Sequence, residues 1–256
     1  MPILLLDLHG VLANQQLLKK SYQEFLTQLY GQFGLSRERA IFYEQKGWNQ
    51  FFNNYLKVQK EHLIGSSFLE RMYQSDREWD EIIREPIKSK PNYNEIKRYF
   101  ESRNVELNAG KMYDIIYPDA KCFLKKWKAS YWNWILIIIS NAHKCHIKGV
   151  LDGWNNDSTK RIEYFGWETF QCFKSHPDYF YRVETFIKSL YPEERLIFLI
   201  GNSTDEMIGS SKTSIKPILI KREREVTDEA IAKALTNLDS LDSLWFFLVK
   251  ELEKNH

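Results

Sequence analysis

The chain has 256 residues, of which 43% are hydrophobic and 27% are charged, and this composition excludes a disordered or fibrous protein. Its length is sufficient for one large α/β domain or for a domain with a smaller cap. The formal net charge is +2, from 36 basic and 34 acidic residues, so the overall charge predicts no nucleic-acid partner and no membrane partner.

The cysteine content and the most apolar segment predict a cytoplasmic protein. Cys122, Cys145 and Cys172 are odd in number and widely spaced, and no signal peptide precedes them, which is typical of a reduced intracellular chain. The most apolar segment, residues 131–139, falls well below the roughly 18 residues that suggest a membrane-spanning helix. We therefore expect a buried strand there.

The first element in the chain is a short apolar strand that ends in a carboxylate. Residues 3–6 are Ile-Leu-Leu-Leu, and Asp7 follows them. Continuous apolar character is typical of a strand buried in a parallel sheet, and open α/β sheets carry their functional residues beyond the carboxyl ends of the strands. Asp7 is therefore the first candidate for a functional residue.

Residues 15–115 have a different pattern, which is typical of a helical region. Apolar residues recur at steps of three and four within residues 17–29, and a similar face runs from Phe51 through Phe52, Tyr55 and Leu56 to Val58. Breaks at residues 65–67 and 90–92 separate the helices, of which we expect about four to six. The aromatic residues Trp48, Tyr55 and Trp79 either pack inside this region or line a substrate pocket.

From residue 117 onward the pattern alternates between helix and strand. The predicted order is a helix at 119–129, a strand at 135–139, a helix after Asn141, a short strand at 164–165, a helix at 177–190, a strand at 196–200, a helix from Ser203, a strand at 217–220 and a helical tail over 227–254 with Thr227 as its N-cap. This alternation predicts a parallel sheet.

Four short motifs follow one another along the predicted α/β part of the chain. They are Asp7 to Leu12 after the first strand, Ser140-Asn141 after the strand at 135–139, Lys174 followed by Pro177 and Phe180, and Gly201-Asn202 followed by Asp205 and Glu206. In the content and order of these segments the chain resembles the haloacid dehalogenase superfamily. Residues 117–119, together with the paired acids 205 and 206, are also loosely similar to the enolase-phosphatase branch.

The resemblance implies an α/β fold with a Rossmann-like three-layer α/β/α core around a parallel sheet, plus an α-helical cap domain. Residues 1–14 and 116–256 would form the core. Residues 15–115 would form the cap, which closes over the site and selects the substrate.

The resemblance also implies a reaction. The expected activity is hydrolysis of a small-molecule phosphomonoester through an aspartyl-phosphate on Asp7, with His9 at the acid/base position. Lys174 would neutralise the transferred group, and Ser140 and Asn141 would bind it.

The implied cofactor is Mg²⁺, which prefers oxygen ligands. Its ligands would come from the Asp7 carboxylate, the backbone carbonyl of His9 and the side chain of Asn202, with Asp205 and Glu206 nearby.

Two positions depart from the superfamily pattern, because His9 and Asn202 stand where aspartates are usual. Three hypotheses follow: a slow or unusual phosphatase, a metal-independent hydrolase of the dehalogenase branch in which Asp7 attacks carbon, and a degenerate member that binds a ligand or partner without turnover. Neither the natural substrate nor the oligomeric state can be inferred from the sequence.

Two further clusters have simpler interpretations. His143, Cys145, His146 and His176 are zinc-ligand types but lack a CxxC or HExxH pattern, which favours ordinary helix residues, with His143 and His146 as possible phosphate contacts near Ser140. The charge run at residues 221–225 is typical of a solvated turn.

Overall fold

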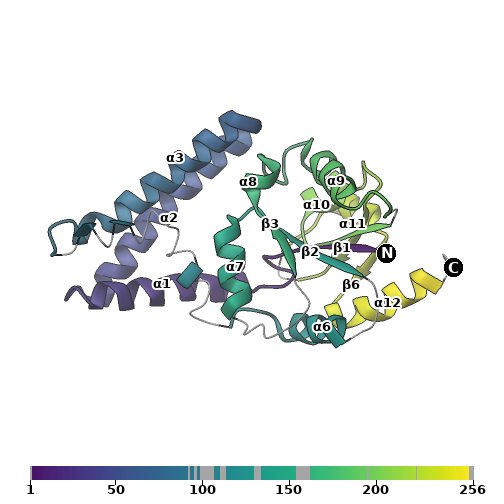
Figure 1. Cartoon of the computed structure of the whole chain (residues 1–256), viewed down its shortest axis with the longest axis horizontal. Helices are drawn as coiled ribbons and strands as arrows, with labels where there is room; N and C mark the ends of the chain where they lie inside the picture. Colours follow the sequence, from purple (N-terminus) through teal and green to yellow (C-terminus); the bar gives the residue numbers. More distant parts are fainter. Residues whose placement is uncertain are drawn as a thin grey trace.

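The computed structural model of the chain describes residues 2–91, 93–94, 97–98, 107–109, 114–129, 134–153, 162–194, 196–222 and 224–253. Within these residues a parallel six-stranded sheet has the order β3-β2-β1-β4-β5-β6 (Figure 1). Its strands are β1 (Ile3–Asp7), β2 (Ile135–Ile139), β3 (Glu163–Phe165), β4 (Ile197–Gly201), β5 (Lys216–Ile220) and β6 (Thr236–Leu238).

The order of the strands reverses at β1, because β2 and β3 extend the sheet on one side of it and β4 to β6 on the other. Such a switch point opens a crevice at the carboxyl ends of the strands, where open α/β sheets bind their ligands. Asp7 is the last residue of β1 and therefore lies at this point.

The helices of the described residues divide into two groups. Those that follow or connect strands are α6 (Pro118–Ala129), α7 (Lys144–Gly153), α8 (Trp167–Phe170), α9 (Tyr179–Leu190), α10 (Thr204–Ser210), α11 (Asp228–Lys233) and α12 (Leu241–Glu253). The others are α1 (Gln15–Gly31), α2 (Arg37–Lys60), α3 (Gly65–Arg84) and the 3₁₀ turn η1 (Glu85–Ile87).

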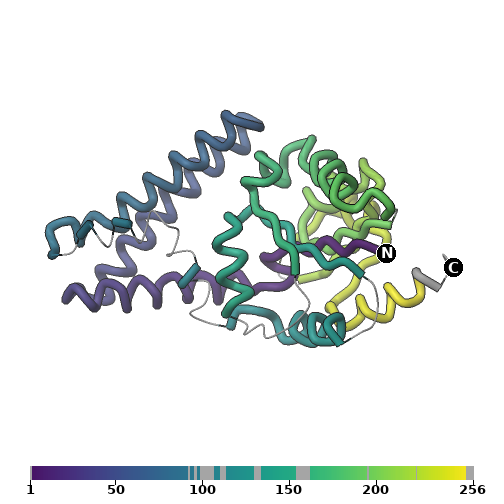
Figure 2. The backbone as a smooth tube through the Cα atoms, in the orientation of Figure 1, coloured from purple at the N-terminus to yellow at the C-terminus, as the bar shows by residue number. Residues whose placement is uncertain are grey.

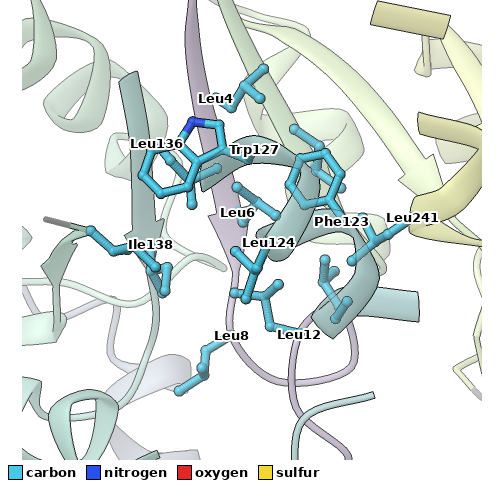
Figure 3. Close-up of a cluster of buried hydrophobic side chains, with 14 of the residues drawn as sticks. Leu4, Leu6, Leu8, Leu12, Phe123, Leu124, Trp127, Leu136, Ile138 and Leu241 are labelled. Atoms are coloured by element: carbon cyan, nitrogen blue, oxygen red, sulfur yellow. The ribbon is translucent and has the colours of Figure 1, made fainter. Parts of the chain in front are cut away.

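Alternate residues of β1 face two separate apolar clusters, as the two-residue period of a strand requires. Leu4 and Leu6 pack with side chains of α6 and α12, including Phe123 and Leu241 (Figure 3). Ile3 and Leu5 belong to the other cluster, which includes the apolar face of α9. The sheet is therefore covered by helices on both faces, which confirms the predicted three-layer α/β/α architecture.

Helices α1, α2 and α3, which we call the cap helices, project from one side of the sheet (Figures 1 and 2). The chain enters this region where Ala13 forms an antiparallel bridge with Ile116, and the Asn14 N–H donates to the Ile115 carbonyl at 2.8 Å. The start and the end of the insertion are thus adjacent in space. The domain boundaries expected next to them, at 14/15 and 115/116, stay predictions.

The helical tail predicted over 227–254 is wrong in part. Thr227 does cap α11, its side chain accepting from the Ala230 N–H, but β6 interrupts the tail before α12 begins. This edge strand has only three residues and none is fully buried, so it lacks the apolar run that marks a central strand.

Two details of the cap region also differ from the sequence pattern. Phe52 and Leu56 are 54% and 59% exposed, so the expected apolar face of α2 is only partly buried. The described part of residues 15–115 holds α1, α2, α3 and η1, and its residues 93–94, 97–98 and 107–109 are also helical. No helix of the described residues has both the length and the apolar character needed to cross a membrane. Cys122, Cys145 and Cys172 form no disulfide.

Candidate active site

The predicted motifs meet at the carboxyl ends of three adjacent strands. Asp7 pairs in register with Ile139, so Ser140 begins directly beside it, and Leu6 pairs with Ile200 on the other side, next to Gly201 and Asn202. The ends of β1, β2 and β4 thus bring the first, second and fourth motifs together.

Lys174 joins two of these strand ends through buried ion pairs. Its Nζ lies 2.5 Å from Asp7 Oδ1 and 2.6 Å from Glu206 Oε1, and all three side chains are at least nine-tenths buried. The loop after α8 carries Lys174, whose backbone N–H donates to Asn141 Oδ1 at 3.0 Å. The structure therefore brings the predicted nucleophile and the predicted lysine into direct contact.

The position of Glu206 follows from local helix chemistry. Ser203 and Glu206 form a capping box at the start of α10, in which Glu206 Oε2 accepts from the backbone N–H groups of Asn202 and Ser203 and from Ser203 Oγ, at 2.8–3.1 Å. Both carboxylate oxygens are thus occupied by hydrogen bonds. Glu206 holds Lys174 rather than standing open to a ligand.

The charges of this cluster shift one another. Burial and repulsion from Glu206 raise the pKa of the Asp7 carboxyl from 3.8 to about 7, against the opposing attraction of Lys174. Burial also disfavours the charged forms of Glu206 and Lys174, but their mutual attraction and hydrogen bonds outweigh it, so the pKa of Glu206 is lowered and that of Lys174 is raised. Lys174 is therefore charged at neutral pH, and Asp7 is the carboxyl group of this cluster whose pKa lies near 7.

His9, the residue at the acid/base position, belongs to a separate hydrogen-bonded group. Its Nε2 lies 3.1 Å from His146 Nε2, and His146 Nδ1 lies 3.2 Å from the Tyr22 hydroxyl. Burial, and then the nearby His146, lower the pKa of His9 well below its usual value, and burial lowers the pKa of His146 to about 4. Both imidazoles are therefore neutral at pH 7, and His9 holds no proton ready for donation as an imidazolium.

Ser140 and Asn141, the predicted substrate-binding pair, differ in their surroundings. Ser140 is fully buried and its Oγ accepts from the Ala142 N–H at 3.1 Å. Asn141 lies between the cap helices and the core, because its Nδ2 donates to the Tyr55 hydroxyl at 3.3 Å while its Oδ1 accepts from the Lys174 N–H. Tyr55 thus reaches the site from α2, whereas Trp48 and Trp79 pack against each other.

The residues expected to hold Mg²⁺ fit that ion poorly. Asn202 provides a neutral oxygen, Asp205 is exposed, and Glu206 is fully hydrogen-bonded, while the Lys174 ammonium already lies against Asp7. No group of three His, Cys, Asp or Glu side chains within the described part of the chain is arranged to hold a metal ion. Asn202 Oδ1 nevertheless is a buried acceptor without a hydrogen-bond partner.

Arg224 is a candidate that the sequence interpretation placed in a solvated charge run. The loop that carries it is anchored on both sides of the site: Arg222 donates to the Val11 carbonyl at 3.3 Å, and the Thr227 N–H donates to Thr204 Oγ1 at 3.2 Å. Arg224 itself is exposed, has no ion-pair partner among the described residues, and acts electrostatically on Asp7. A sequence pattern does not reveal these two contacts, which fix the position of the loop next to the site.

Comparison with solved structures assigns the fold. The defluorinating L-2-haloacid dehalogenase Rha0230 aligns at 12% identity with a TM-score of 0.59, covering 95% of this chain and 93% of that one. The HAD-hydrolase YfnB from Bacillus subtilis, bound to magnesium, aligns at 13% identity and 0.57, covering 96% and 98%. A predicted phosphoglycolate phosphatase from Haemophilus somnus aligns at 17% identity and 0.51, covering 96% and 97%.

No family model and no curated protein sequence matches the chain. The chain nevertheless has the haloacid dehalogenase fold, as its structural neighbours establish. Dehalogenases and a predicted phosphatase both have this fold, so the likeness assigns the fold and leaves the reaction to the chemistry of the site.

Proposed function

We propose that this chain is a metal-independent hydrolase in which Asp7 displaces a leaving group from carbon and the resulting ester is then hydrolysed. The observation that carries the proposal is the contact of the Lys174 ammonium with Asp7 and Glu206 at 2.5 Å and 2.6 Å. The fixed Lys174 ammonium keeps part of the Asp7 population ionised and orients the Asp7 carboxylate. A carboxylate must be both ionised and oriented to act as a nucleophile.

The site can release only a leaving group that departs without receiving a proton. His9 is neutral, and the Asp that usually protonates a departing oxygen is absent at this position. An alkoxide leaving from a phosphomonoester needs such a proton, whereas a halide departs as a stable anion. The site therefore favours substitution at carbon over phosphoryl transfer.

The balance of charge favours the same reaction. Asp7 and Glu206 place two carboxyl groups against one ammonium, and no divalent cation is needed to hold them. A phosphate dianion approaching Asp7 would bring two negative charges to this excess on the reacting group itself, whereas a 2-haloacid brings one, on a carboxylate that is not the reacting centre. In the first step the carboxylate oxygen of Asp7 bonds to carbon as the carbon–halogen bond breaks; in the second, water converts the ester to an alcohol and regenerates Asp7.

A phosphomonoester hydrolase, the first expectation from the sequence, is the second candidate. It is favoured by the unpartnered, buried Asn202 Oδ1, an oxygen at the position from which a magnesium ligand would come. The magnesium-bound YfnB shares the fold. This candidate predicts phosphate release that depends on added Mg²⁺.

One paired assay separates the candidates. We would measure halide release from 2-chloropropionate and 2-chloropropionamide, and phosphate release from a panel of phosphomonoesters, each with EDTA or with Mg²⁺. We expect halide release that EDTA leaves unchanged and that Asp7→Asn lowers by about a thousandfold or more. Asp242→Asn, an equivalent change at an exposed ion pair with Lys126, should have no effect.

The other outcomes are equally specific. Magnesium-dependent phosphate release without halide release would establish the second candidate. Absence of turnover with both panels, combined with phosphatase activity in His9→Asp, would identify a degenerate member that has lost its acid/base residue. Turnover in H₂¹⁸O should label the Asp7 carboxylate, because water attacks the ester at Cγ.

A further inference from the structure

One side of the cap helix α2 contacts the loop that carries Lys174. The Tyr55 ring lies against the Phe173 ring, with centroids 4.2 Å apart. One turn further along α2, Gln59 Nε2 donates to Ser175 Oγ at 3.1 Å. Residues four apart in a helix lie on the same side of it, so the residues before and after Lys174 are both held by one side of α2.

Lys174 itself is joined to the same helix through Asn141. The Lys174 backbone N–H donates to Asn141 Oδ1 at 3.0 Å, and Asn141 Nδ2 donates to the Tyr55 hydroxyl at 3.3 Å. A backbone N–H can only donate, so it determines which end of the Asn141 amide is the oxygen and makes the Tyr55 oxygen the acceptor. Gln59 Nε2 donates to this oxygen as well, at 3.2 Å. Tyr55 and Gln59 thus form one hydrogen-bonded group with the loop.

The position of this loop decides whether the Lys174 ammonium reaches Asp7. The ammonium contacts Asp7 and Glu206 at 2.5 Å and 2.6 Å. A lysine side chain has many rotamers, so these two contacts persist only if the backbone of residue 174 is held at the right distance. A displacement of about 1 Å at a reacting group can lower a rate about a hundredfold.

The hydrogen bonds from α2 are separate from the packing that holds the cap on the core. Tyr55, Gln59 and Ser175 are each only partly buried, so removing one hydrogen bond leaves no fully buried polar group without a partner. The rings of Phe173 and Phe68 remain in contact, at 4.9 Å between centroids, whether or not these hydrogen bonds form. Variants that lose only the hydrogen bonds should therefore fold.

We propose that Tyr55 and Gln59 are positioning residues that hold the Lys174 loop, so that the ammonium orients Asp7 while α2 lies against the core. This inference rests on the proposed function, in which Lys174 orients the nucleophile. Neither residue takes part in a bond-making step. Their effect is on the rate at which Asp7 attacks bound substrate, and the affinity for substrate stays the same.

Two variants remove the hydrogen bonds and keep most of the side chain: Tyr55→Phe and Gln59→Leu. Their matched controls are Tyr73→Phe and Gln50→Leu. Tyr73 lies on the cap helix α3 and packs on a tryptophan of α8, with ring centroids 5.5 Å apart. Gln50 lies on α2, and its Nε2 donates to Glu78 Oε2 at 2.7 Å within the cap. The controls remove the same groups at contacts other than those with residues 173–175.

The first measurement is single-turnover formation of the Asp7 ester from 2-chloropropionate, by rapid quench and mass spectrometry. Tyr55→Phe and Gln59→Leu should each lower the rate constant at saturating substrate about tenfold and change the substrate Kd by less than about twofold. Both controls should stay within about twofold of the wild-type rate constant.

The second measurement needs no substrate. In ¹⁵N-lysine-labelled protein the buried Lys174 ammonium should give a slowly exchanging signal, which Lys174→Met identifies by its loss. Tyr55→Phe and Gln59→Leu should broaden or remove this signal because the ammonium is no longer held in one place. The signal should be unchanged in Tyr73→Phe and Gln50→Leu.

A double-mutant cycle tests the contact between Gln59 and Ser175. If Gln59 acts through this contact, Gln59→Leu combined with Ser175→Ala should slow ester formation no more than Gln59→Leu alone. Ser175→Thr keeps the hydroxyl and should retain the wild-type rate.

The positioning role is overturned if Tyr55→Phe and Gln59→Leu keep the Lys174 signal, if they change Kd and not the rate constant, or if the controls lose as much. If the wild type forms no ester with any substrate, the proposed function fails instead. The Lys174 signal then still decides whether α2 holds the lysine.

Discussion

Asp7, Lys174 and Glu206 form a buried group with two carboxyls and one ammonium. Glu206 is stabilised as an anion by its capping hydrogen bonds, whereas Asp7 receives its recorded hydrogen bond from Lys174 alone among the described residues. Burial is the main cause of the raised Asp7 pKa of about 7, and repulsion from Glu206 adds to it, so the excess negative charge is removed most easily by protonating Asp7. Glu206 thus both holds Lys174 and raises the pKa of Asp7.

The first prediction concerns the pH dependence of activity. Because only the ionised form of Asp7 is a nucleophile, kcat/KM should rise with pH through about 7 and level off above it. Glu206→Gln removes the repulsion that raises this pKa, so its profile should move to lower pH. A wild-type profile that is flat between pH 5 and 8 would contradict this assignment.

The second prediction concerns stability. Lys174→Met leaves two buried carboxyls without a cation, which should cost about 3–5 kcal/mol where both are ionised. The cost should fall at pH 5, where Asp7 is protonated in the folded state, and Asp7→Asn should restore part of the loss. Urea unfolding at pH 5 and pH 8 measures this, and Lys188→Met, at a half-exposed pair with Glu184, should cost less than about 1 kcal/mol at either pH.

The third prediction concerns Arg224. Its exposed guanidinium acts on Asp7, His9, Tyr55 and Asp205, which come from different parts of the chain. Arg224→Ala should therefore lower kcat/KM for 2-chloropropionate about tenfold and that for 2-chloropropionamide by less, because only the acid carries a charge that the guanidinium attracts. Lys221→Ala removes a charge from the same loop and is the control; equal losses with acid and amide would show that Arg224 acts on structure rather than on charge.

Among the secondary-structure elements, the central strands could be predicted because burial on both faces leaves a continuous apolar run. The strand at residues 135–139 is an example, and Ser140 after it fixes where the strand ends. Lys174 could be placed near Asp7 only through the order of the motifs. His9 and His146 are in contact although they lie 137 positions apart in the chain, and Tyr55 and Asn141 are in contact at a separation of 86 positions. No spacing rule predicts contacts of this kind.

The fourth prediction tests the turn that follows β1. Gly10 has φ +85°, and a Cβ built there would lie 1.9 Å from Asn202 Nδ2, so Gly10→Ala should strain the backbone and displace Asn202. Gly34 has φ +70° with no atom near its Cβ position, so Gly34→Ala carries the backbone strain alone. Gly10→Ala should lose more stability than Gly34→Ala in urea unfolding and should also lose activity. Equal stability with full activity in both variants would mean that Asn202 is not held against this turn.

At the scale of the whole molecule, one of the contacts between the cap helices and the core is made by Phe173, the residue that precedes Lys174. Phe173 packs against Phe68 of α3 and Tyr55 of α2, with ring centroids 4.9 Å and 4.2 Å apart. The same cluster includes Trp167 at the start of α8. The apolar contact that seats the cap and the ion pair that aligns Asp7 are thus carried by neighbouring residues.

The fifth prediction follows from this coupling. Phe173→Ala should cost about 3–5 kcal/mol and should also raise KM and lower kcat, because the cap loses its seat while Lys174 loses the packing that fixes its loop. Phe123→Ala removes a phenyl ring of the same size from the cluster on the face of β1 opposite to α9, where Phe123 packs against Trp245 of α12 with ring centroids 6.5 Å apart. It should match the loss in free energy of unfolding but leave the kinetics of the folded protein unchanged. If both variants change KM equally, activity depends on global stability, and Phe173 has no separate role in joining the cap to the site.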